Sequence, residues 1–200
     1  MKYNYRILRY FFKNFIWHIP NHQNKIYLTF DDGPTPGVTE KVIEILNEFD
    51  VKATFFLLGK NAENYPQYFS LYKHFGHNTG NHTYSHPNGW FTKLSDYIND
   101  VEKSKNIIPG NLFRPPYGKL TLKQAKNLQA NFKIVMWDVI SYDFDTSITP
   151  NFCIKHVMKY ARSGSILLFH DSRKSARNTL PALTEIIPRL LERGFQFDVI

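Results

Sequence analysis

"KIYLTFDDGP", residues 25–34, joins an apolar run to two adjacent carboxylates and a Gly-Pro turn. A short apolar run bounded by turn residues is typical of a buried strand. Asp31 and Asp32 carry like charges that repel each other, so this is either an ordinary acidic turn or a pair held by positive partners. Because neighbouring strand residues point to opposite faces, we expect different roles for them: one binds a cation, and the other faces substrate or water.

Six further apolar segments follow, and amphipathic stretches separate them. The expected strands are 25–30, 52–59, 77–82, 112–116, 133–140, 165–170 and 195–200, and the expected helices are 37–49, 61–74, 94–107, 121–129, 149–161 and 178–192. Thr39 is a candidate cap of the first helix, and Pro188 is expected to kink or shorten the last one. The alternation predicts an α/β fold with a parallel sheet covered by helices. Seven strands favour a closed or nearly closed barrel over a doubly wound open sheet.

The composition indicates one soluble globular domain. The chain has 200 residues, with 42% hydrophobic and 21% charged residues, and a net charge of +8. A basic balance suits nucleic acid, an anionic membrane surface or an anionic polymer. No run of five like charges and no nucleic-acid-binding motif accompanies it, so we expect a solvated basic surface and no nucleic-acid partner.

The first 24 residues form a basic, aromatic extension that we expect to pack on a domain spanning 25–200. A helix over 5–17 that caps the domain is the favoured interpretation, and weak interfacial contact with a membrane is the alternative. Arg9 and Lys13 interrupt the apolar runs and no small-residue cleavage site follows, so no signal peptide is predicted. No transmembrane segment is predicted either. Cys153 is the single cysteine, which suits a reducing compartment, and we expect a cytoplasmic location by default.

Two histidines four residues apart, His82 and His86, lie in "GNHTYSHP", residues 80–87. One helical turn would place both imidazoles on the same side, and Pro87 would end such a turn at once. With one aspartate they make a His/His/Asp ligand set, which leaves the fourth position of a tetrahedral zinc for water. Taken alone, the pair also fits two unrelated polar residues.

Two more polar residues follow predicted strands. Arg114 comes after an apolar strand in "LFRPPYGK", where it can hold a carboxylate in bidentate geometry or be a surface residue before a turn. His170 ends the strand "SILLFH", where a structural histidine is the alternative. Asp31, Asp32, His82, His86, Arg114 and His170 therefore all lie at or just past the ends of four predicted strands. In barrels of parallel strands the functional residues gather at these ends, so coincidence is the poorer explanation.

In this order, "TFDDGP", "HTYSH", "RPPYG" and "LLFH" resemble the motifs of polysaccharide deacetylases, the NodB-homology group or carbohydrate esterase family four. The resemblance covers residues 25–200 and implies a distorted (β/α) barrel of seven strands. It also implies one divalent metal, zinc first, with Co²⁺, Ni²⁺ and Mn²⁺ as alternatives. Asp32, His82 and His86 would be its ligands. Asp31 would be the base that takes a proton from metal-bound water, and Arg114 would hold Asp31.

The same resemblance assigns three residues to the substrate side. The backbone N–H of Tyr117 would face the developing oxyanion, His170 would protonate the departing amine, and Leu168 would line the pocket for the acetyl methyl group. The implied activity is removal of N-acetyl groups from a saccharide that contains N-acetylglucosamine, of chitooligosaccharide or peptidoglycan type.

One motif departs from the family pattern. A D-S-x-D-W segment is expected after the fifth strand, but the sequence reads "WDVISYDFD", with Ile140 and Phe144 at the first and last positions. The missing aspartate would tune His170. Asp138, on the same strand face as Ile140, and Asp143 are the two candidates to replace it. We count Asp138 and Phe144, which keeps an aromatic wall, among the substrate-binding residues.

Two other functions stay open at this point. The absence of an export signal motivates a metal-dependent amidase or esterase acting on a small amide, an imide or an O-acetyl ester. The changes at Ile140 and Phe144 motivate a non-catalytic saccharide-binding relative, although base, ligands and acid are all present. Oligomeric state has no signature in the sequence.

Overall fold

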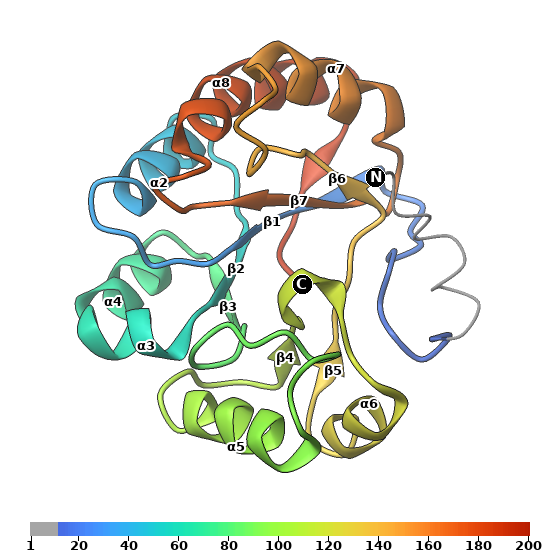
Figure 1. Cartoon of the computed structure of the whole chain (residues 1–200). Coiled ribbons are helices and arrows are strands. Elements are labelled where there is room, and N and C mark those ends of the chain that lie inside the picture. Colours follow the sequence, from blue (N-terminus) through green and yellow to red (C-terminus); the bar gives the residue numbers. More distant parts are fainter. Residues whose placement is uncertain (1–11) are drawn as a thin grey trace.

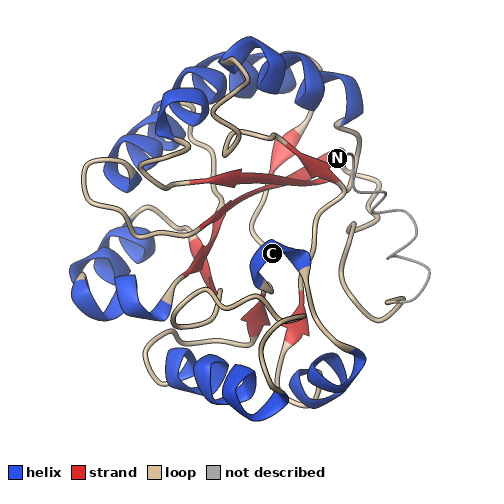
Figure 2. Ribbon diagram, viewed as in Figure 1, coloured by secondary structure: helices blue, strands red, loops and turns tan. Residues whose placement is uncertain are grey.

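The computed structural model describes residues 12–200 and forms a curled parallel sheet with helices on its outside (Figures 1 and 2). The strands are β1 (Lys25–Asp31), β2 (Thr54–Leu57), β3 (Asn78–Asn81), β4 (Leu112–Phe113), β5 (Lys133–Ile134), β6 (Val139–Ile140), β7 (Ile166–His170) and β8 (Gln196–Phe197). Their order is β5-β4-β3-β2-β1-β7-β6, and β8 pairs with the start of β1. All these pairs are parallel, which confirms the distorted (β/α) barrel with seven strands along its main path.

The strand predicted over 133–140 is wrong as one element. It forms β5 and β6, which lie at the two ends of the strand order. Between them, the Val135 N–H still donates to Phe113 of β4 while Val135 pairs with Ile16 of the N-terminal segment, and by Asp138 the backbone N–H donates to Ile166 of β7 instead. A local apolar pattern cannot show that the partner strand changes in the middle of the run.

The helices of the described residues are α2 (Thr39–Glu48), α3 (Gly59–Asn64), α4 (Gln67–His74), α5 (Leu94–Lys105), α6 (Leu122–Leu128), α7 (Pro150–Tyr160) and α8 (Ala176–Glu192), with a short 3-10 turn η1 (Pro116–Gly118). The single helix predicted over 61–74 is wrong, because Pro66 divides it into α3 and α4. Pro188 does not shorten α8, which runs on to Glu192. Burial of its apolar face, including Ile187 and Leu190, offsets the lost backbone hydrogen bond.

The N-terminal segment 12–19 is not helical, so the helix expected over 5–17 is wrong for residues 12–17; residues 5–11 lie outside the described part of the chain. Ile16 forms a parallel bridge with Val135, and His18 forms an antiparallel bridge with Ser165. Phe15 and Trp17 of the same segment are buried. The segment therefore connects the end of β5 with the start of β7, on the open side of the curled sheet between β5 and β6 (Figure 1). The division of the chain at residue 24 stays a prediction.

Alternation along β1 builds two cores. Ile26, Leu28 and Phe30 pack outward against the helices, including α2 and α8. Tyr27 packs in the second core, inside the curl of the sheet. Asp31 is in phase with Tyr27, so the same alternation turns its carboxylate toward the interior. Within residues 12–200, no helix has the length and apolar character that crossing a membrane requires.

Candidate active site

The parallel register brings the predicted site residues to one end of the sheet. Asp31 pairs with His170 of β7 on one side of β1 and with Phe56 of β2 on the other. The backbone N–H of His82 donates to Leu57 at the end of β2, and that of Arg114 donates to Asn81 at the end of β3. Four strand ends separated by up to 139 residues of sequence thus meet at one rim, as expected for functional residues of a parallel barrel.

A pocket of about 540 Å³ opens at this rim. Such a volume suits a small ligand or one sugar unit. Eight of the ten predicted site residues line it: Asp31, Asp32, His82, His86, Tyr117, Phe144, Leu168 and His170. Arg114 lies behind the wall, fully buried. Asp138 is elsewhere.

Arg114 holds Asp31 in place. One terminal nitrogen, Nη1, donates to Asp31 Oδ1 at 2.7 Å and to Thr29 Oγ1 at 2.8 Å. Nη2 donates to the carbonyl of Met136 at 2.9 Å, so the expected bidentate contact with the carboxylate is wrong. The guanidinium carbon also lies 4.0 Å from the Phe56 ring centroid. Backbone and ring contacts leave a single nitrogen for Asp31, whose other oxygen is directed toward the pocket residues.

Asp31 is a buried carboxylate: Oδ1 binds Arg114, and Oδ2 is directed toward the pocket. Burial raises its pKa, and the Arg114 guanidinium and the His170 imidazole counteract part of that rise. Asp31 Oδ2 lies 3.8 Å from His82 Nε2, so this oxygen faces the other polar groups of the site. A carboxylate with a raised pKa is suited to accept a proton near neutral pH.

Asp32, His82 and His86 form the group of described residues in which ligand atoms for a metal lie within 4.8 Å of one another. His82 Nδ1 lies 2.7 Å from the Arg114 carbonyl oxygen. A carbonyl only accepts, so the neutral imidazole carries its proton on Nδ1 and donates it to this oxygen. Nε2 is then left with its lone pair toward Asp32 Oδ1, at 3.7 Å. His86 Nε2 lies 3.3 Å from the same oxygen. Burial, and then the nearby His86, lower the pKa of His82 to about 3, so its imidazole is neutral, as a ligand requires.

The two histidines converge through a loop and not through a helical turn over 82–86. Thr83 and His86 have positive φ values of 69° and 63°. The Asn81 side chain accepts a hydrogen bond from the Thr83 N–H, and Thr83 Oγ1 accepts one from the His86 N–H. These side-chain acceptors stabilise the positive φ values of the loop. The loop places both imidazoles on the same side, as a helical turn would have done.

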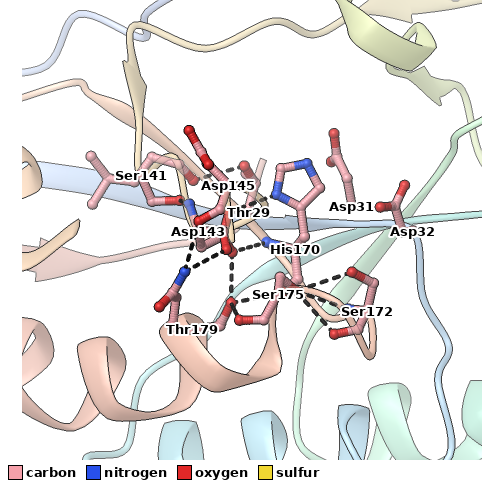
Figure 3. Close-up of polar contacts among 12 residues, drawn as sticks. Thr29, Asp31, Asp32, Ser141, Asp143, Asp145, His170, Ser172, Ser175 and Thr179 are labelled. Carbon is pink, nitrogen blue, oxygen red and sulfur yellow. Dashed lines mark hydrogen bonds and ion pairs between the residues drawn. The ribbon is translucent and has the colours of Figure 1, made fainter. Parts of the chain in front are cut away.

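Asp143 supports His170. Its Oδ1 lies 2.8 Å from His170 Nδ1, and its Oδ2 accepts from the His170 backbone N–H at 2.7 Å and from Thr179 Oγ1 at 2.6 Å. Figure 3 shows His170 between Asp143 on one side and Asp31 and Asp32 on the other. Burial alone would lower the pKa of His170, but the charge and hydrogen bond of Asp143, with Asp32 and Asp31, raise it to about 9. His170 is therefore a protonated imidazolium at neutral pH.

The alternative that Asp138 supports His170 is wrong. Its carboxylate contacts His18 Nδ1 at 3.1 Å and accepts from the backbone N–H of Ile166, at the opposite end of β7. Asp138 lies two residues before Ile140, so the two side chains share a strand face. The Asp138 side chain, however, lies one layer deeper in the barrel than the site. Asp138 also lies outside the pocket lining, so the structure does not bring it to the substrate side.

Several pocket residues were not singled out in the sequence. Trp90, Lys119, Trp137, Tyr142, Asp145, Ser172 and Lys174 also line the pocket. Trp90 follows His86 by four residues in the loop "PNGWF", and an aromatic residue in a polar loop after a ligand motif is a signal that could have found it. The others come from loops whose direction depends on the tertiary fold.

The fold and the site together define the class of protein: a parallel α/β barrel with a carboxylate, an imidazolium and an Asp/His/His group around one pocket at the strand ends. Comparison with known proteins identifies the family. The polysaccharide deacetylase family model matches residues 18–136, more than half of the chain, and the chain belongs to this family.

Relatives of known activity cover most of the chain. A peptidoglycan-N-acetylglucosamine deacetylase of Bacillus cereus is 36% identical over 186 residues, which are 89% of this chain and 67% of that protein. A chitooligosaccharide deacetylase of Azorhizobium caulinodans is 36% identical over 197 residues, covering 88% of this chain and 93% of that one. A crystal structure of a peptidoglycan N-acetylglucosamine deacetylase superposes with a TM-score of 0.90 at 33% identity over 96% of this chain and 94% of that one. The protein is thus an N-deacetylase, a hydrolase.

Proposed function

We propose that this protein removes N-acetyl groups from a saccharide that contains N-acetylglucosamine, with one divalent metal ion, zinc first. The observation that carries the proposal is the shared pocket, in which the Asp32/His82/His86 group, Asp31 and His170 face one another. The names of the relatives support a peptidoglycan or chitooligosaccharide substrate.

The residues present fit a metal ion. Asp32 Oδ1 is a buried oxygen with no hydrogen-bond donor among the described residues, although two imidazole nitrogens face it within 4 Å. A carboxylate oxygen and two neutral imidazole nitrogens are the ligand types that zinc prefers, and three of them leave an open position. The Arg114 carbonyl orients His82 from behind, as outer partners of metal-binding histidines do. Bound zinc would lower the pKa of a water to about 7 and polarise the carbonyl oxygen of the substrate.

Asp31 and His170 then divide the proton transfers. Asp31 accepts the proton of the attacking water, and Arg114 keeps its carboxylate in one orientation. His170, a protonated imidazolium held by Asp143, donates a proton to the departing nitrogen, which would otherwise be a poor leaving group. Base and acid are two groups with different protonation states at one pH, as amide hydrolysis requires.

Two residues complete the substrate side. Leu168 is apolar, is buried and lines the pocket, so it suits the acetyl methyl group. Tyr117 has a positive φ of 59° in the turn after Arg114, and we propose that its backbone N–H stabilises the developing oxyanion. Its ring lies 4.6 Å from the His86 ring, measured between centroids, which places the turn beside the proposed ligands.

Acetate release tests the proposal. The purified protein is stripped with a chelator, reloaded with Zn²⁺, Co²⁺, Ni²⁺ or Mn²⁺, and assayed on chitooligosaccharides, peptidoglycan fragments and small acetylated amides and esters. We expect activity on the saccharides that is lost on chelation and restored by metal, and one bound metal per chain by elemental analysis. Activity on the small compounds alone would replace the saccharide function with that of a small-molecule amidase or esterase. Full activity of the metal-free protein would contradict the proposed dependence on a metal ion.

A further inference from the structure

Trp90 lies at the mouth of the pocket and has no role in the chemistry described above. The residue is 49% exposed, whereas tryptophan is highly buried on average. It lines the pocket near Tyr117 and Lys119, because Lys119 Nζ lies 4.9 Å from the Trp90 ring centroid and 5.9 Å from that of Tyr117. Asp31 and His170 line the same pocket, so a ligand longer than one unit that extends from them toward the Tyr117 turn meets Trp90.

The loop that carries Trp90 is held by hydrogen bonds from α6. Gln124, buried in α6, donates from Nε2 to the Gly89 carbonyl at 2.9 Å and to the Thr92 carbonyl at 3.1 Å. Thr92 Oγ1 donates to the Asn88 carbonyl at 2.8 Å, which closes the loop on itself. The indole is fixed as well, because its Nε1 donates to the Leu120 carbonyl at 3.3 Å.

Gly89 makes this attachment sterically demanding. A Cβ at this position would lie 2.3 Å from the Lys119 carbonyl oxygen and 2.9 Å from Gln124 Oε1. The loop is therefore pressed against the start of α6, and the sequence uses the residue without a side chain at the point of contact. An exposed aromatic ring on a loop held this tightly loses little freedom when a ligand covers it.

We propose that the Trp90 indole is a stacking platform for the sugar ring that neighbours the acetylated one; this rests on the proposed function of the site. A pyranose ring presents a face of C–H groups that packs on an aromatic plane, while its hydroxyls stay at the edge for hydrogen bonds. Lys119 Nζ lies over the indole, 4.9 Å from its centroid, so the sugar would stack on the other face of the ring. The substrate class is then a saccharide of two or more units, with one unit at the reacting groups and the next on the indole.

A chain-length series tests the platform. Acetate release is measured for wild type, Trp90→Ala, Trp90→Phe and Phe91→Ala on chitooligosaccharides from the monosaccharide to the hexasaccharide. For Trp90→Ala we expect KM to rise about five- to tenfold on chains of two or more units, with kcat and the monosaccharide KM unchanged. Trp90→Phe should keep most of the affinity. Phe91→Ala is the matched control, since Phe91 is the next residue, is 85% exposed and does not line the pocket.

Two outcomes would overturn the platform: an equal loss on the monosaccharide, which places the indole at the reacting sugar, or equal effects of Trp90→Ala and Phe91→Ala. Calorimetric binding of deacetylated chains supplies a readout that needs no turnover, and Trp90→Ala should weaken it by the same factor. Wild type that binds these chains but releases no acetate would contradict the proposed function and leave the platform standing. Active wild type with an unchanged Trp90→Ala variant would contradict the platform alone.

Discussion

At the scale of single residues, Asp31 and His170 occupy one register position of neighbouring strands, yet their surroundings differ. Burial raises the pKa of Asp31. Burial also acts on His170, but there the Asp143 carboxylate prevails and raises the pKa to about 9. The fold thus prepares a base that can accept a proton and an acid that holds one, side by side.

Asp143→Asn tests the source of this acidity. Without the carboxylate, the pKa of His170 should fall from about 9 toward its ordinary value of about 6.5. Because the acid must be protonated to act, activity is lost as pH rises through its pKa. We therefore expect the alkaline limb of the pH–rate profile to move toward neutral pH, and kcat above neutral pH to fall about 10–100-fold.

Asp145→Asn is the control, because Asp145 also lines the pocket but has no hydrogen bond to His170. The alkaline limb of the pH–rate profile of Asp145→Asn should lie at the same pH as that of wild type. NMR titration of the His170 imidazole reports the same shift without turnover, and an Asp143→Asn protein whose His170 still titrates near 9 would refute the role of Asp143.

Arg114→Met leaves the Asp31 carboxylate buried without its partner. Removing one member of a buried pair costs about 3–5 kcal/mol of unfolding free energy, so we expect a loss of that size by urea denaturation. Asp31→Asn should cost less, or stabilise, when introduced into the Arg114→Met variant, because it removes the unpaired charge. Arg189→Met, which breaks the exposed pair with Glu185, should cost at most about 0.5 kcal/mol. Equal losses for both arginines would contradict this account.

At the scale of elements, the loop after β1 is braced from the loop after β7. The Asp171 N–H donates to the Asp31 carbonyl, and Asp171 Oδ2 accepts from Thr39 Oγ1 at 2.5 Å. Thr39 is the first residue of α2, and its side chain binds the loop after β7. Its predicted role as the cap is wrong, because the cap position is Val38. Burial raises the pKa of Asp171 to about 7. Gly33 lies directly on this carboxyl group.

Gly33→Ala should destabilise the protein through that contact. A Cβ at Gly33 would lie 2.2 Å from Asp171 Oδ2, and overpacking of this kind costs about 1–3 kcal/mol. The cost, measured by urea denaturation, should shrink when Asp171→Ala removes the obstacle. Gly37→Ala isolates backbone strain, because Gly37 has a φ of 80° and nothing within 4 Å of an added Cβ, and should cost about 1 kcal/mol. A Gly33→Ala cost that is insensitive to Asp171 would refute the steric explanation.

At the scale of the whole molecule, the curled sheet needs its N-terminal segment. β5 and β6 end the strand order, and Ile16 occupies the gap by pairing with Val135. Phe15 and Trp17 fill the interior beside it, with 7% and 6% of their surfaces exposed. This segment therefore belongs to the same hydrophobic core as the pocket-forming strands.

Trp17→Ala should lower the unfolding free energy by about 3–5 kcal/mol, because it leaves a cavity in that core. Thermal and urea unfolding measure the loss, and a single transition is expected for wild type and variant. Phe91→Ala, at an exposed aromatic residue, should change the stability by at most about 0.5 kcal/mol. A Trp17→Ala protein as stable as wild type would show that the segment does not share the cooperative core.

The sequence alone determined the fold class and most of the site. Alternating strands and helices require a parallel sheet, and motifs at three strand ends place Asp31, Asp32, His82, His86 and His170 at one rim, because parallel strands end on the same side. Periodicity is a local property, so these features could be read from short windows of the chain.

Only the tertiary structure decided the rest. Asp143 rather than Asp138 supports His170, because the depth of each side chain in the barrel depends on where β6 ends and the following loop turns back. Likewise, the split of 133–140 depends on Ile16, more than 100 residues earlier. The position of Trp90 depends on Gln124, a residue of another element. Such contacts join segments that are distant in sequence, and no local pattern encodes which of them will meet.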